Sequence, residues 1–196
     1  FDYRAPSNQL DLVTAYGMGF NLTNLNSLFA MVSDESGQMS SDTSHTSYRL
    51  LPASTYKDEH PSWFYKPGSA AAEQLCYTAG GAIQTSKEDR ESETPNEYNM
   101  MVDAMFERLT RFLKEYPDND SVCIAIQDNW GFCDCSGCKY SKNKYGTNSA
   151  SVVMFMNDVD YLLQAYLEEQ AQQNNTKKRD FTICFIAYHE TLEPPV

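Results

Sequence analysis

The chain has 196 residues, of which 41% are hydrophobic and 21% charged, a composition typical of a globular protein that can bury one sizeable core. The formal net charge of −12 at pH 7 argues against nucleic acids and anionic membranes as partners, and it is neutral about uncharged ligands such as sugars. No stretch reaches the roughly 18 consecutive apolar residues that a membrane-spanning helix requires.

The sequence opens on Phe1 and not on Met, and strand-like residues lie near both ends. We therefore expect residues 1–196 to be the central portion of one domain, truncated at both ends, whose partners include the remaining part of the same polypeptide. Arg4 ends the opening segment. If that segment is a strand, Arg4 could hold the hydroxyls or the carboxylate of a ligand, although an internal salt bridge is an equal alternative.

Two further segments precede the first clear helix. His60 opens an extended, aromatic segment, His60-Pro61-Ser62-Trp63-Phe64, and could serve either as a ligand contact or as a structural histidine. A short strand is expected at 74–78, and it contains Cys76.

The clearest helix is expected at 94–116. Thr94 would be its N-cap, Pro95 suits the first helical position, and Glu97 would complete a capping box. Apolar residues recur every three or four positions and predict one buried face: Tyr98, Met101, Val102, Met105, Phe106, Leu109, Phe112, Leu113 and Tyr116.

The apolar run at 122–127 predicts a strand that is buried on both faces, as in a parallel sheet. Asp128, Asn129 and Trp130 follow it directly. In parallel α/β folds ligands bind at this end of the strands, and a partly desolvated carboxylate there suits acid or base chemistry. A turn or helix cap is the structural alternative for Asp128.

Three cysteines then fall within six positions, at Cys133, Cys135 and Cys138. Together with Cys76 as a fourth ligand they could bind a structural Zn²⁺, or two of them could form a disulfide in an oxidising compartment. We expect this cluster to fix the loop after the strand and not to be catalytic, because four thiolates leave no open metal position.

A second helix is expected at 149–173 with Ser149 as its cap, followed by a strand at 181–188. The alternation of helix and strand predicts an α/β fold with parallel strands. Glu190, which follows the last strand, would then lie near Asp128, and two such carboxylates would suit glycoside hydrolysis. An exposed or capping role is the alternative for Glu190.

These residues together resemble the domain-of-unknown-function family 4838, part of which is classed as glycoside hydrolase family 163. The resemblance extends over most of the chain, through short motifs that occur in the same order: Tyr3-Arg4, His45 with Leu50-Leu51-Pro52, His60-Pro61-x-Trp63-Phe64, Gln74-Leu75-Cys76, Asp128 with the three clustered cysteines, Asn157, Ala187-Tyr188, Thr191 and Pro194-Pro195. Asn129 stands where relatives often have Gly, and Glu190 does not match an acid of the family.

The resemblance implies part of a (β/α)₈ TIM-like barrel, related to α-glucuronidases and β-hexosaminidases, in secreted, periplasmic or cell-surface glycan degradation by bacteria. It also implies an endo-β-N-acetylglucosaminidase acting on N-glycans, without a cofactor in catalysis. Asp128 would be the acid/base or would orient an acetamido group. Contacts to the sugar would come from Arg4, His45, His60, Asn129, Trp130 and Tyr188. The alternative is a non-catalytic carbohydrate-binding or scaffold barrel.

Overall fold

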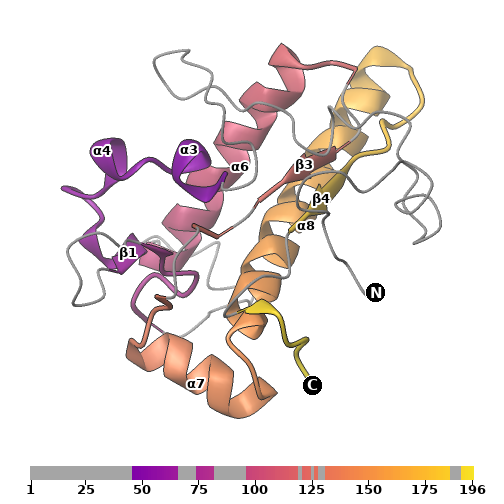
Figure 1. Ribbon diagram of the computed structural model, residues 1–196. Helices are drawn as coiled ribbons and strands as arrows, with labels where there is room; N and C mark the ends of the chain where they lie inside the picture. Colours follow the sequence, from indigo (N-terminus) through magenta and orange to yellow (C-terminus); the bar gives the residue numbers. More distant parts are fainter. Residues whose placement is uncertain are drawn as a thin grey trace, which may run out of the picture.

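The computed structural model shows two long helices beside a short parallel strand pair, with smaller elements grouped at one end (Figure 1). It describes residues 46–65, 74–81, 96–118, 121–124, 126–127, 131–185 and 191–196.

Helix α6 spans Glu97–Glu115 and confirms the first predicted helix, but its N-cap differs. The cap is Asn96 and not Thr94, because the Asn96 side chain accepts a hydrogen bond from the backbone N–H of Asn99 at 2.8 Å. An asparagine is as good a cap as a threonine, and the bond to the third helical residue decides between them. Glu97 is therefore the first helical residue, and its carboxylate is available to other partners.

Helix α8 spans Ser149–Asn174 and confirms the second predicted helix. Its N-cap is Asn148, so the prediction of Ser149 as the cap is wrong. Ser149 is instead the first helical residue, is buried, and donates from Oγ to the carbonyl of Glu193. That contact fixes the segment after 190 against the start of α8.

Strands β3 (Ser121–Cys123) and β4 (Thr182–Cys184) pair in parallel, with Val122 opposite Ile183. The order of strand, helix and strand along the chain predicts such a pair, since a helix must cross over between parallel neighbours. The paired segments are shorter than the predicted strands at 122–127 and 181–188. Ile124 and Ile126 are nevertheless buried, so the apolar run continues into the core beyond the paired residues.

The N-terminal part of the described chain consists of small elements. These are α3 (Ser47–Leu50), α4 (Ala53–Tyr56), the 3₁₀ turn η1 (Pro61–Trp63), and the antiparallel pair β1 (Phe64–Tyr65) and β2 (Gln74–Leu75). Arg108 of α6 is buried and donates to the carbonyls of Arg49 and Leu50 at the end of α3, at 3.2 Å each. These bonds fix α3 against α6.

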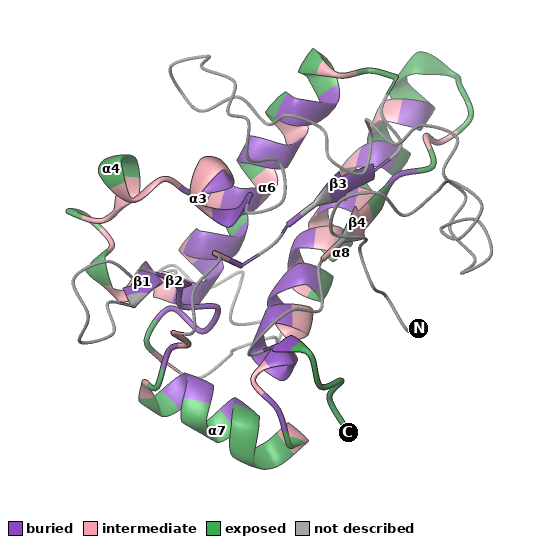
Figure 2. Ribbon diagram, viewed as in Figure 1, coloured by how far each residue is buried: buried purple, intermediate pink, exposed green. Residues whose placement is uncertain are grey.

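A further helix, α7 (Ser136–Tyr145), begins within the cysteine cluster and was not predicted. Its sequence lacks a regular apolar stripe, and Figure 2 shows it exposed over much of its length. It ends at Gly146, whose φ of +80° is the left-handed conformation common at helix C-termini.

The core lies between α6, α8 and the β3–β4 pair, and Figure 2 shows buried residues along both long helices. Phe155 of α8 is fully buried, with its ring edge-on to Tyr77 and Tyr98 at centroid distances of 5.5 and 6.1 Å. Among the described helices, none combines the length and apolarity that crossing a membrane would need.

We expect Phe155→Ala to lower the free energy of unfolding by about 3–5 kcal/mol, because it leaves a cavity between α8 and two aromatic rings. Urea denaturation of the full chain measures this loss. Tyr161→Ala on the same helix is the control: its side chain is 67% exposed, and its loss should stay within about 0.5 kcal/mol. Equal losses in the two variants would contradict this assignment of the core.

Candidate metal centre

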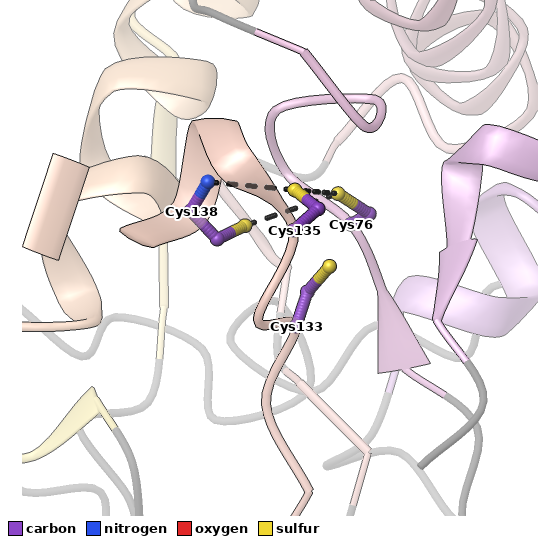
Figure 3. A group of neighbouring side chains, drawn as sticks. All are labelled: Cys76, Cys133, Cys135 and Cys138. Carbon is purple, nitrogen blue, oxygen red and sulfur yellow. Dashed lines mark hydrogen bonds between the residues drawn. The ribbon is translucent and has the colours of Figure 1, made fainter. Parts of the chain in front are cut away.

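Four cysteine side chains meet at the junction of β2, the segment after β3, and α7. Cys76 follows β2, Cys133 and Cys135 lie on the segment that leads into α7, and Cys138 lies in the first turn of α7. Their sulfur atoms all lie within 4.8 Å of one another, and Figure 3 shows the side chains converging. The prediction that Cys76 lies with the other three cysteines is confirmed. We call Cys76, Cys133, Cys135 and Cys138 the four-cysteine group.

The sulfurs lie close enough together to bind one ion. Cys76 Sγ lies 3.6 Å from Cys135 Sγ and 3.8 Å from Cys138 Sγ, and all four cysteines are free thiols. Four thiolates at about 2.3 Å from a tetrahedral Zn²⁺ lie about 3.8 Å apart, by simple tetrahedral geometry. Cys76, Cys133 and Cys138 are buried and Cys135 is half-buried, so a bound ion would be shielded from water.

Local backbone structure directs N–H groups at two of the sulfurs. The turn after Cys76 contains Ala79 and Gly80, with φ of +47° and +79°, and the Gly80 N–H donates to Cys76 Sγ at 3.1 Å. Positive φ is uncommon for a residue with a Cβ, so Ala79 is held there by its surroundings. Cys135 is the N-cap of α7, and its sulfur accepts from the N–H of Cys138 at 3.4 Å.

Hydrogen bonds among the thiols distribute their protons unequally. The hydrogen bond with Cys133 is the largest influence that lowers the pKa of Cys76 from 9.0 to about 7. The same partner lowers the pKa of Cys135 below the ordinary thiol value. Hydrogen bonds raise the pKa of Cys133, chiefly that with Cys135, and of Cys138, chiefly that with Cys133. Cys76 and Cys135 therefore favour thiolate, the form that binds metal ions.

The end of the β3 segment is held by a second contact to β2. The side chain of Gln74, which is buried, bonds both backbone groups of Gln127: its Nε2 donates to the carbonyl at 2.9 Å and its Oε1 accepts from the N–H at 3.0 Å. Gln127 Nε2 in turn donates to Ser47 Oγ at 2.9 Å. The paired amides fix the backbone just before Asp128.

His60 lies near the start of α6, and its side chain is largely buried, with 21% exposed. Its Nδ1 is 3.0 Å from Glu97 Oε2, and its ring stacks on Trp63 with 4.1 Å between centroids and 8° between planes. The carboxylate and the indole together fix the orientation of the imidazole ring and leave Nε2 as the nitrogen not bonded to Glu97.

Of the residues predicted for a sugar site, the structure describes only His60. Arg4, His45, Asp128, Asn129, Trp130, Tyr188 and Glu190 lie outside the described residues. The structure adds Thr78 and Gly137 to the site, and it gives Gln74 and Glu97 contacts, with Gln127 and His60, that the sequence did not predict. A polar Gln within a strand-like apolar run and a Cys-x-x-Cys at a helix start are the signals that could have indicated Gln74 and the start of α7.

In the part of the chain that the structure describes, a four-cysteine group fixes the segment that follows a strand of the parallel β3–β4 pair. The chain belongs to the family described as Domain of unknown function (DUF4838), whose model matches residues 2–196. No curated protein and no solved structure matched the chain.

We expect Gly137→Ala to disrupt the four-cysteine group. A Cβ at Gly137 would lie 1.6 Å from the carbonyl oxygen of Gly81 and 2.7 Å from Thr78 Oγ1, so α7 would have to move away from the turn. The free energy of unfolding in urea should fall by at least about 1–3 kcal/mol, as for other overpacked sites.

Gly81→Ala is the matched control, because a Cβ there meets no atom within 4 Å. Its stability should stay near that of the wild type, and its four clustered thiols should keep their native rate of reaction with a thiol reagent. If Gly137→Ala were as stable as Gly81→Ala, the close approach of α7 to this turn would be incorrect.

Proposed function

We propose that this chain is the middle part of a glycoside hydrolase barrel that acts on glycans. The proposal rests on membership of the family, on the resemblance to glycoside hydrolase family 163, and on the parallel strands β3 and β4, which are connected through helices α7 and α8. In (β/α)₈ barrels the catalytic residues follow the carboxyl ends of the strands. Secreted or surface glycan degradation by bacteria is part of this proposal.

One observation supports a site at this place. Strand β2 and the residue after it contact the chain both before and after Asp128. Gln74 holds the backbone of Gln127, and Cys76, two residues further on, lies against the group that contains Cys133. The two residues that flank this stretch, Gln127 and Cys133, are therefore both held by contacts to β2 or to Cys76, which follows it. Short loops whose ends are fixed in this way are suited to holding functional side chains.

In this proposal Asp128 acts as acid/base, or orients the acetamido group of an N-acetylglucosamine unit in substrate-assisted hydrolysis. Asn129, Trp130 and Tyr188 line the sugar site, and Arg4, His45, His60 and Glu190 contribute contacts. His60 suits a sugar contact because Glu97 and Trp63 already fix its ring. A hydrogen bond from Nε2 to a sugar hydroxyl would then cost no side-chain freedom on binding. The remaining part of the polypeptide supplies the second acidic residue.

We expect Asp128→Asn in the full-length protein to lower turnover of N-glycan substrates by about 10²–10⁴-fold, the contribution typical of a positioned acid or base. Release of oligosaccharide from a glycoprotein, followed by chromatography, measures this effect. Asp134→Asn is the control, because Asp134 is an exposed carboxylate 66% accessible to solvent and should leave turnover unchanged.

Unchanged turnover in Asp128→Asn would remove Asp128 from the mechanism. A wild-type protein that binds glycans and hydrolyses none of them would replace the enzyme with the alternative, a carbohydrate-binding barrel.

We further propose that the four-cysteine group binds one structural zinc ion. The residues fit zinc through their donor atoms: four soft sulfur ligands lie within 4.8 Å of one another, are largely buried, and have N–H groups directed at two of them. The ion would join Cys76 to the segment that leads into α7. Because all four positions are taken by sulfur, it would stabilise the fold and leave catalysis to Asp128.

Metal analysis tests this directly. The purified full chain should contain one zinc per chain, and Cys76→Ser should lose it, because a serine hydroxyl is a poor ligand for zinc beside three thiolates. Cys184→Ala in β4 is the cysteine control and should keep one zinc per chain. Iron in place of zinc, or disulfides among these four cysteines in the purified protein, would contradict the assignment.

A further inference from the structure

The hydroxyl of Thr78 lies against three of the four sulfurs. Its Oγ1 is 3.3 Å from Cys135 Sγ and 3.4 Å from both Cys76 Sγ and Cys138 Sγ, and Thr78 is fully buried. A point almost equally distant from three atoms lies on the axis through the centre of their triangle. Oγ1 therefore covers one face of the four-cysteine group, and in a tetrahedral arrangement the sulfur of Cys133 is the vertex behind that face.

The place of Thr78 follows from the local backbone. The carbonyl of Thr78 accepts from the N–H of Gly81 at 3.0 Å, which closes the turn that also directs the Gly80 N–H at Cys76. Tyr77, between Cys76 and Thr78, packs on Phe155 in the core instead. Cys76 and Thr78 thus lie together on the side of the sulfurs, while Tyr77 between them faces the core.

A buried zinc with four thiolates would carry a net charge of 2 − 4 = −2, counted over the ligands of the four-cysteine group. Burial of such a charge is unfavourable unless hydrogen-bond donors face the sulfurs. The described donors are the N–H groups of Gly80 and Cys138 and the hydroxyl of Thr78. Of these three donors only the Thr78 hydroxyl belongs to a side chain, so it is the donor that a substitution can remove.

We propose that the Thr78 hydroxyl closes one face of the metal centre and donates a hydrogen bond to a thiolate on that face, and so determines how tightly the metal is held. This rests on the zinc site proposed above. A metal-bound thiolate can only accept, so the hydroxyl proton is directed at sulfur, and the covered face excludes water and a fifth ligand. Thr78 acts through the sulfurs and is a positioning residue for the metal.

The test compares zinc affinity and zinc release in the full chain with those of Thr78→Val, which keeps the shape of the side chain and removes the donor. Competition with a chromogenic chelator measures both quantities. We expect zinc binding to weaken by about 10–100-fold, as for other lost partners of metal ligands. Thr78→Ser keeps the hydroxyl and should restore binding to within a few-fold of the wild type.

A second measurement uses Co²⁺ in place of Zn²⁺. The visible bands of the Co²⁺-loaded protein report the environment of the thiolates, so Thr78→Val should shift them and Thr78→Ser should not. Thr110→Val is the matched control, since Thr110 is a helical threonine whose hydroxyl bonds the carbonyl of Glu107 at an exposed position. If Thr78→Val does not fold, Thr78→Ala removes the same hydroxyl without placing a methyl group against the sulfurs.

Two results would overturn this inference while leaving the zinc site intact: zinc held equally tightly by Thr78→Val and by the wild type, or an equal loss in Thr78→Ser. A wild-type chain that binds no zinc would overturn both proposals, and the two failures are therefore distinguishable.

Discussion

The arrangement of the site depends on one short segment, strand β2 and the residues just after it, that contacts the same distant part of the chain twice. Gln74 of β2 bonds the backbone of Gln127, and Cys76 lies 3.6–3.8 Å from the sulfurs of Cys135 and Cys138. The two contacts differ in chemistry, since one is a pair of amide hydrogen bonds and the other a group of thiols. Together they determine where the chain goes after β3 and where α7 begins. The proposals for sugar chemistry, for zinc and for Thr78 all use this geometry.

This segment after β2 is in turn supported by the hydrophobic core. Tyr77 lies between Cys76 and Thr78, is fully buried, and packs edge-on against Phe155 of α8. The close approach of Gly137 to the carbonyl of Gly81 adds a contact that only a residue without a side chain allows. A metal ion at the four-cysteine group would therefore join two segments that the core and the turn already hold in place. This is the condition under which ligands are preorganised and binding costs little conformational entropy.

Sequence reasoning was most accurate where a local pattern carries the information. The four-residue spacing of Met101, Met105 and Leu109 predicted the buried face of α6, and the choice of Cys76 as fourth partner followed from its place at a strand end. Local patterns failed at Thr94, where Asn96 is an equally good cap, and at α7, which has no apolar stripe. The bonds of Gln74 and the place of Thr78 join residues more than fifty positions apart, so no spacing in the sequence could reveal them. The function of Asp128 and the barrel stay predictions.

X-ray absorption at the zinc edge of the purified full chain tests the central claim most directly, because it counts and identifies the atoms around the ion. The account predicts four sulfur ligands at about 2.3 Å and no nitrogen or oxygen neighbour at bonding distance. A shell that contains nitrogen or oxygen, fewer than four sulfurs, or a protein that retains no zinc would contradict it.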